Sequence, residues 1–362
     1  MLERLTLNPS SFGLDLSDSS IKIINLEKRK GGPYCSAWGE MKLERGIIEA
    51  GEIKNEDALV QAIKNAVSNI YGEKIKTKHV VASLPEERSF LQVIQMPKLS
   101  EEEMVSSIHY EVENYIPLSI DNVYFDFQLI RPAGHNINHV DVLINAIPRE
   151  IIDPYVRCIK RAGLIPGALE IESQAITRAL INKNRSDIPT LIVDIGENKT
   201  IFIIFSGTSL RFTFSFPFSS SKITQSIAEK SAVDMETAED IKRKYNLQEG
   251  GRDPELKDVF EAIRENLIDL TQEMKKHLEF YKTRTTHEHL PNSTGEVGKI
   301  ILCGGGSNLR GIDKFVEERV GVITEIGNPW TNASNVVTKK DSLSLEKSLG
   351  LSTAIGLALR DF

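Results

Sequence analysis

Residues 12–26 read FGLDLSDSSIKIINL, and residues 191–205 read LIVDIGENKTIFIIF. In each stretch an apolar run ends in an aspartate, a short polar turn follows, and an isoleucine-rich run resumes. This pattern predicts a strand, a tight turn and a second strand in both places. Asp15 and Asp194 occupy the same position in the two patterns, which indicates a chain built from two related halves.

Length, charge and cysteine content limit the classes of protein to which this chain can belong. A chain of 362 residues exceeds what one hydrophobic core usually organises, so at least two structural units are expected. The net charge of -7 argues against a surface made for nucleic acid, and no nucleic-acid partner is expected. Cys35, Cys158 and Cys303 lie far apart, which favours neither a disulfide framework nor a zinc site and suggests a cytoplasmic protein.

The chain contains no apolar run of the roughly 20 residues that a membrane-spanning helix needs. We therefore expect no direct membrane insertion. If the protein works at a membrane, another protein must bring it there.

Between and after the hairpins, the periodicity predicts several helices. A helix begins at Asn55, and a second begins at Ser100, where Glu103 completes a capping box. Residues 77–162 alternate strand, helix, strand, strand and helix, which predicts a small α+β insert. Residues 254–286 form a long apolar-striped pattern, interpreted as a packed helix rather than a coiled-coil site.

The two hairpins have the composition of a phosphate site. The turns at 17–20 and 196–199 would present backbone N–H groups to phosphates, with the hydroxyls of Ser19, Ser20 and Thr200 in reach. A single such turn reads more simply as an ordinary β-turn, but a matched pair favours phosphate binding.

The carboxylates would complete that site. Asp15 and Asp194 are expected to face each other across a nucleotide cleft and to hold Mg²⁺ through waters, because Mg²⁺ keeps its hydration shell and takes few carboxylates. Lys22 would neutralise phosphate charge.

A glycine turn provides the third element. Gly304, Gly305 and Gly306 follow an apolar run and precede a helix, so the backbone there could approach a base or a phosphate. The chain has neither the Walker pattern nor the dinucleotide pattern, so an ATP site would need another architecture.

Three segments carry a family resemblance: DLSDSSIK, DIGENKT and CGGGSNLRGI resemble the phosphate and adenosine segments of the actin-like ATPase superfamily, which includes FtsA and MreB. The opening FGLDLSDSSIKIINL, the runs LPEE, QMPKLSEEEM and AEDIKRKYNL, and the C-terminal SLGLSTAIGLALR resemble the PilM family of type IV pilus assembly proteins. The resemblance covers nearly the whole chain. It implies an α/β, actin-like, ribonuclease H-like duplicated fold of two lobes, with an insert of the kind that FtsA and PilM share. The four parts that the resemblance implies are 1–76 with 163–188 and 342–362 as the first lobe, 77–162 as the insert, 189–225 with 298–341 as the second lobe, and 226–297 as its helical subdomain.

The resemblance also implies ATP and Mg²⁺ as ligands. The candidate nucleotide contacts are Asp15, Ser17, Asp18, Ser19, Ser20 and Lys22; Asp194, Gly196, Glu197, Asn198, Lys199 and Thr200; Glu239 and Lys242 on a helix bordering the base; and Gly304, Gly305, Gly306 and Ser307. Asp15 and Asp194 match the metal-associated aspartates.

Glu172 is the candidate catalytic residue. Glu172 falls where relatives keep a water-orienting residue, although a solvated glutamate of a first helical turn explains it equally well. Ser17 stands where relatives usually have glycine, and its Cβ would restrict the approach of the backbone to phosphate. We expect at most a slow ATPase.

The resemblance implies an ATP-binding cytoplasmic scaffold of the pilus inner-membrane platform. Its partner would be the N-terminal tail of a PilN-like membrane protein, with nucleotide as a conformational ligand. Other platform proteins and pilus motor components are further candidates, and a homodimer stays open.

Three alternatives remain. An FtsA-like division protein would be expected to end in an amphipathic membrane helix, and a type II secretion L-type component to continue into a transmembrane helix. A true ATPase or phosphotransferase of the same fold would need a substrate base, and none stands in a recognisable context.

Overall fold

The computed structural model describes residues 10–130, 139–248, 256–284, 295–334 and 343–362. Its internal contacts divide the chain into two compact units. Unit 1 comprises Met1–Ser89, Ile147–Lys183 and Pro329–Phe362, and unit 2 comprises Phe90–Ala146 and Asn184–Asn328. In the described residues no helix is long and apolar enough to cross a membrane.

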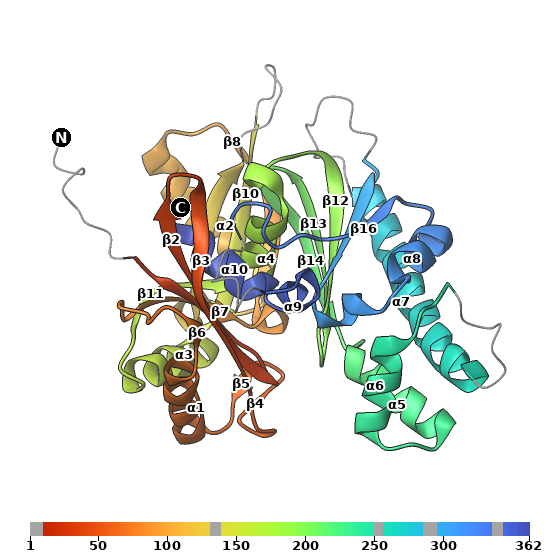
Figure 1. The fold of residues 1–362 in the computed structure, drawn as a ribbon. Coiled ribbons are helices and arrows are strands. Elements are labelled where there is room, and N and C mark those ends of the chain that lie inside the picture. Colours follow the sequence, from red (N-terminus) through yellow and green to blue (C-terminus); the bar gives the residue numbers. More distant parts are fainter. Residues whose placement is uncertain (1–9, 131–138, 249–255, 285–294, 335–342) are drawn as a thin grey trace. The chain divides into compact units, whose positions relative to one another are not determined.

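Unit 1 is built on a six-stranded sheet in the order β11-β7-β1-β2-β3-β6 (Figure 1). Its strands are β1 (Phe12–Leu16), β2 (Ser20–Arg29), β3 (Gly32–Lys42), β6 (Tyr71–Gly72), β7 (His79–Leu84) and β11 (Ile165–Ile171). Its helices are α1 (Glu56–Ser68), α3 (Arg149–Arg161), α4 (Glu172–Leu180), α9 (Leu345–Leu349) and α10 (Ser352–Ala358), and a two-stranded ribbon joins β4 (Ile48–Glu49) to β5 (Glu52–Ile53). The helix predicted to begin at Asn55 is confirmed, because the Asn55 side chain accepts the N–H of Ala58 and caps α1.

Unit 2 contains a five-stranded sheet in the order β14-β13-β12-β15-β16. Its strands are β12 (Ser186–Ile195), β13 (Thr200–Gly207), β14 (Ser209–Phe216), β15 (Lys299–Cys303) and β16 (Thr324–Ile326). Its helices are α5 (Ser220–Ser231), α6 (Met235–Lys244), α7 (Lys257–Arg284) and α8 (Ile312–Val320).

The two sheets repeat one strand order. The series β3-β2-β1-β7-β11 in unit 1 corresponds to β14-β13-β12-β15-β16 in unit 2, with the first three strands antiparallel and the last two added in parallel. The register repeats as well: Asp15 lies opposite Lys22 and Asp194 lies opposite Ile201, seven residues on in each case. The duplication predicted from the two hairpins is therefore present in the backbone.

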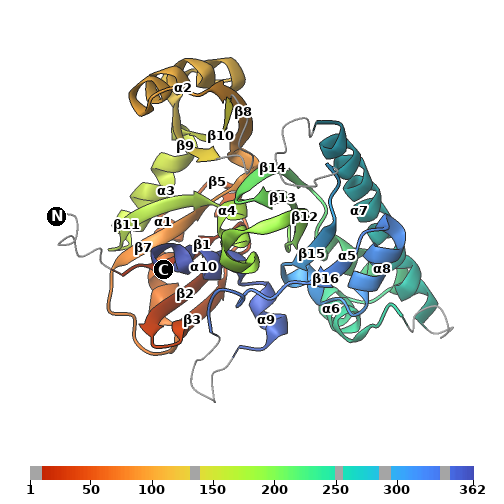
Figure 2. The same ribbon diagram turned by 90° about the horizontal axis from the view of Figure 1, so that it is seen from above.

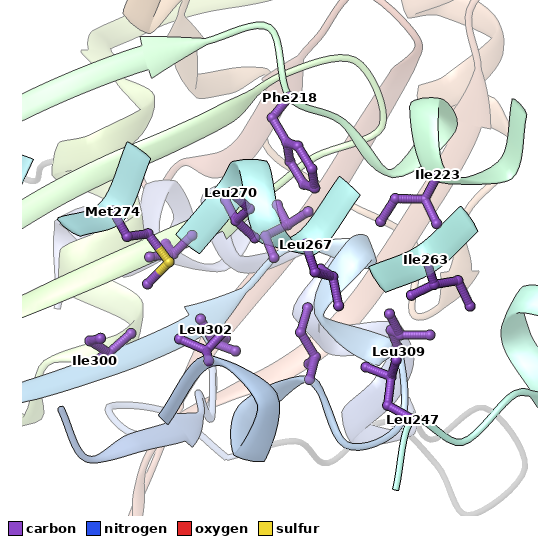
Figure 3. Packing of buried hydrophobic residues seen from close by; sticks show 14 of the residues in the cluster. Phe218, Ile223, Leu247, Ile263, Leu267, Leu270, Met274, Ile300, Leu302 and Leu309 are labelled. Carbon is purple, nitrogen blue, oxygen red and sulfur yellow. The ribbon is translucent and has the colours of Figure 1, made fainter. Parts of the chain in front are cut away.

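Helix α7 packs as the sequence predicted. Ile263, Leu267, Leu270 and Met274 are fully buried and contact apolar side chains of the five-stranded sheet and of α5, as Figure 3 shows from close by. Burying such a side chain stabilises a fold by about 1.5–3 kcal/mol relative to leaving it exposed. The apolar stripe of this helix is thus part of the core of unit 2.

The insert is a three-stranded sheet, β8-β10-β9, covered on one face by α2 (Figure 2). Its elements are β8 (Phe90–Pro97), α2 (Glu101–Tyr115), β9 (Val123–Ile130) and β10 (His139–Pro148). The predicted capping box is confirmed, because the Ser100 hydroxyl accepts the N–H of Glu103 and the Glu103 carboxylate accepts the N–H of Ser100.

The insert is smaller than the predicted range of 77–162. Strand β7 pairs in parallel with β1 and belongs to the six-stranded sheet, and α3 packs against α1 in unit 1. The sequence pattern identified the elements but not their partners, because an alternating strand reads the same in either sheet. We use "the insert" below for residues 90–146.

Candidate functional site

The two candidate aspartates lie near the carboxyl ends of β1 and β12, each of which has a parallel neighbour. In unit 1 Asp15 stands near the end of β1, with the ends of the parallel strands β7 and β11 beside it. In unit 2 Asp194 stands near the end of β12, opposite Cys303 at the end of the parallel strand β15. This edge is where open α/β sheets usually bind ligands, because turns and helix ends meet there.

Asp15 is a buried carboxylate of unit 1 with one oxygen that lacks a hydrogen bond from the described residues. Only 3% of the residue is exposed, and its Oδ1 accepts no hydrogen bond from the described residues. Its Oδ2 lies 3.8 Å from Nζ of Lys22, its cross-strand neighbour. Buried carboxylate oxygens are nearly always paired, so an orphaned one fits a site for a hydrated cation.

The first turn is closed by its own serines. The Ser17 hydroxyl donates to the carbonyl of Ser20 at 3.0 Å and accepts the Ser20 N–H at 3.2 Å, while the Ser17 N–H also donates to that carbonyl. Its side chain is therefore folded into the turn and holds it rigid. On the neighbouring strand, the Ser83 hydroxyl accepts the N–H of Leu16 and fixes the end of β1.

Asp18 has a role that the sequence did not suggest. Its carboxylate accepts the N–H groups of Ala50 at 2.8 Å and Gly51 at 3.1 Å. Both residues have positive φ, 47° and 75°, in the turn between β4 and β5. Asp18 therefore anchors this ribbon to the first hairpin, which explains the aspartate without a ligand.

The second hairpin is tied to helix α5. Its Gly196 and Glu197 carbonyls accept the N–H groups of Ser220 and Ser221, so these two donors of the helix are already satisfied. Thr200 is fully buried, and its hydroxyl donates to the Phe218 carbonyl at 2.9 Å. This hydroxyl is thus used within the fold, and a contact from it to phosphate stays a prediction. The sequence could not reveal this bond, because the partner follows the end of β14, the strand that pairs with β13.

The three glycines of the 304–306 turn have different reasons to be glycine. Gly304 has a φ of +80°, and a Cβ there would lie 2.3 Å from Oδ1 of Asp194. A Cβ on Gly306 would lie 2.3 Å from Cγ2 of Ile195. Gly305 is exposed and would meet nothing within 4 Å. Gly304 and Gly306 are glycines because they pack closely on the second hairpin. Of the three, only Gly305 has backbone that a ligand could approach.

Three further candidates lie within unit 2. The Ser307 hydroxyl donates to the Cys303 carbonyl at 2.5 Å. Nζ of Lys242 donates to the Ser220 and Thr224 hydroxyls and lies 2.7 Å from the Glu239 carboxylate, so it joins α6 to α5. Burial lowers the pKa of Lys242, against the opposing effect of Glu239. Glu239 keeps about a third of its side chain exposed.

Glu172 pairs with a residue that the sequence did not single out. Its Oε2 accepts the Glu86 N–H at 3.1 Å, and Oε2 of Glu86 accepts the Ser173 N–H at 3.0 Å. Both glutamates are buried, with 6% and 4% of the residue exposed. The exchange joins the end of β7 to the start of α4. The LPEE run after an apolar strand was the one available signal for Glu86.

The candidate residues therefore form two separate sets, one in each unit, which are called half-sites below. In unit 1 these are Asp15, Lys22 and the turn at 17–20; in unit 2 they are Asp194, the turn at 196–199 and Gly305. Within the described ranges no three His, Cys, Asp or Glu side chains form a direct metal shell. A magnesium ion held through its waters does not require one.

The repeated strand order and the aspartate-bearing hairpin in each unit define an actin-like protein of two lobes. The same fold is found in MreB5 of Spiroplasma citri bound to ADP, at a TM-score of 0.52 and 14% identity over 94% of each chain. The ethanolamine utilization protein EutJ of Carboxydothermus hydrogenoformans is similar at a TM-score of 0.57 and 15% identity, over 97% of this chain and 89% of that one.

The chain belongs to the family described as type IV pilus assembly protein PilM, whose profile matches residues 13–362. A chain of the PilM-PilN type IV pilus biogenesis complex matches with a TM-score of 0.78 and 26% identity, over 97% of this chain and 98% of that one. Among curated proteins, the cell division protein FtsA of Enterococcus hirae is 23% identical over 92% of this chain and 83% of its own length.

Proposed function

We propose that this chain is an ATP-binding scaffold of type IV pilus assembly that binds the N-terminal cytoplasmic tail of a PilN-like membrane protein. The observation that carries the proposal is the likeness over 97% of the chain, at 26% identity, to a chain of a PilM-PilN complex. The protein would then be peripheral at the inner membrane, held there by its partner.

Nucleotide binding rests on the two half-sites. The orphaned Oδ1 of Asp15 fits a water of a hydrated Mg²⁺, and the open backbone at Gly305 fits the close approach of a base. MreB5 of Spiroplasma citri is described as bound to ADP and to AMPPNP. We infer that Asp15 and Asp194 hold magnesium and that each hairpin turn contacts phosphate.

Nucleotide would act as a conformational ligand rather than as a substrate consumed quickly. The carboxylate of Glu172 accepts a backbone hydrogen bond from Glu86, which positions the start of α4 and competes with the orientation of a water. Ser17 stiffens the first phosphate turn through its hydroxyl. Both contacts favour holding a nucleotide over rapid turnover.

Isothermal titration with Mg-ATP tests the nucleotide half of the proposal. Asp194→Ala should weaken binding at least about tenfold, which corresponds to about 1.4 kcal/mol. Asp269→Ala is the matched control, because Asp269 is an exposed aspartate of α7 in the same unit. Equal affinities in the wild type and Asp194→Ala would overturn the assignment of Asp194.

Titration with a synthetic peptide tests the scaffold half. Peptides should copy the N-terminal cytoplasmic tails of the membrane proteins encoded beside this chain, and a scrambled peptide of the same composition is the control. One tail should bind and its scrambled form should not. Failure of every tail, with Mg-ATP still bound, would reject the scaffold while leaving the nucleotide site intact.

A further inference from the structure

The sheet of the insert buries a carboxylate on the face opposite α2. Along β10, Val142 and Ile144 face α2, so the alternating residues Asp141 and Leu143 point to the other side. Both are nevertheless buried, with 1% and 4% exposed. Strand β8 of the insert contacts β14, the edge strand of the five-stranded sheet in the same unit. The insert is therefore docked on that edge.

One ion pair crosses this contact. Nη1 of Arg211, on β14, donates to Oδ2 of Asp141 at 2.9 Å, and 10% of the arginine side chain is exposed. Arg211 sits in a β-bulge, because the register between β13 and β14 passes from Phe205 opposite Leu210 to Ile204 opposite Phe212. A bulge turns the extra residue out of the regular alternation of the strand and allows its side chain to reach the insert.

The polar groups around this pair are incompletely satisfied. In the described part of the chain, Nε of Arg211, Oδ1 of Asp141 and Oδ1 of Asn145 take part in no hydrogen bond. Asn145 lies on the same face of β10 as Asp141, and His139 Nε2 is 3.7 Å from Oδ1 of Asp141. Buried groups without partners cost free energy that hydration recovers when the contact opens.

The insert is connected along the chain to a different unit from the one on which it packs. The chain enters the insert after Ser89 and leaves it before Ile147, and both residues belong to unit 1. The docking contact, in contrast, is made to β14 of unit 2. The insert is thus connected along the chain to unit 1, and among the described residues it packs on the rest of unit 2 through the Asp141–Arg211 ion pair and the contact between β8 and β14.

We propose that Asp141 and Arg211 form a latch that holds the insert on β14 and that is poised to open. In the closed state the edge strand β8 of the insert lies against the edge strand β14. In the open state Asp141, Arg211 and Asn145 become hydrated, and the insert stays attached only through its two connections to unit 1. The proposal is independent of nucleotide binding and of the identity of any partner.

Hydrogen–deuterium exchange of the full chain tests the latch. Arg211→Met removes one partner, leaves Asp141 buried and uncompensated, and should speed amide exchange in β8 and β14 at least about tenfold. Strands β12 and β1 should keep their wild-type exchange. Lys230→Met is the control, because it breaks the exposed pair of Lys230 with Glu265 between α5 and α7 of the same unit. It should leave β8 and β14 unchanged.

A double variant separates a poised latch from a purely structural pair. In Asp141→Leu with Arg211→Met the junction becomes apolar, and such replacements often match or exceed the ion pair in stability. Exchange in β8 and β14 should then fall below the wild-type rate, because no hydrated open state is favoured.

Three results would overturn the latch. They are unchanged exchange in Arg211→Met, an equal rise in β12 and β1, or a double variant that exchanges as fast as the single one. Should Arg211→Met fail to fold, Arg211→Lys replaces it; this variant keeps the charge and loses the planar fork. It should give an intermediate rise confined to β8 and β14, and wild-type rates there would reject the proposal.

Discussion

Alanine should destabilise the protein at Gly304 but not at Gly305. Gly304→Ala would place a Cβ 2.3 Å from Oδ1 of Asp194 at a φ of +80°. We expect a loss of at least about 2 kcal/mol in the free energy of unfolding, from left-handed strain and overpacking together. Gly305→Ala meets no atom within 4 Å and should unfold like the wild type in urea. Equal stabilities of the two variants would contradict the assignment of Gly304 to packing.

His277 should make unit 2 sensitive to acid. Its ring on α7 lies among Phe202, Phe212 and Phe214, and burial lowers its pKa from 6.5, although Glu273 opposes the shift. The unfolded chain therefore takes up a proton near pH 6.5 that the folded chain resists. Stability should fall as the pH drops below about 6.5, by at most about 1.4 kcal/mol per pH unit, and should level off below the folded pKa.

Urea unfolding between pH 5 and pH 8 measures this dependence. His277→Leu should flatten the curve below about pH 6.5, whereas His109→Leu, at an exposed histidine of α2, should not. A curve for His277→Leu as steep as that of the wild type would exclude the histidine as the cause.

At the scale of elements, the exchange between Glu86 and Glu172 predicts how α4 is held. Glu172→Ala leaves the Glu86 N–H without its acceptor and should cost about 1–3 kcal/mol of unfolding free energy. Glu172→Gln retains an oxygen acceptor and should cost less. A loss of ATP turnover in Glu172→Gln without any loss of stability would instead support the water-orienting role.

The elements themselves were largely predictable, but their partners were not. The two hairpins, the caps at Asn55 and Ser100 and the stripe of α7 follow from local periodicity and capping chemistry. The hydroxyl of Thr200 and the carboxylate of Asp18 are used by groups distant in sequence or on another strand, which no local pattern encodes. For the same reason β7 was assigned to the insert rather than to the sheet that it completes.

At the scale of the whole molecule, nucleotide should stabilise both units. Under the proposed function both hairpins contact the nucleotide, so Mg-ATP at about 100 times its Kd should add about 2.7 kcal/mol to the unfolding free energy. Amide exchange should slow at the ends of β1 and β12 alike, and Asp194→Ala should abolish both effects. Slower exchange in one unit alone would show that the other hairpin does not take part.

The last prediction separates a scaffold from an enzyme. If nucleotide is a conformational ligand, the affinity for the partner tail must differ between the apo and the Mg-ATP forms, and by linkage the tail must change ATP affinity by the same factor. Titrating each ligand in the presence of the other measures both factors, and unequal factors would mean that a further equilibrium intervenes. Phosphate release should stay below about 1 per second with or without tail, which is the low end for enzymes. Fast phosphate release together with a coupling factor of one would instead identify an enzyme, because ATP would then be hydrolysed without changing the affinity for the partner tail.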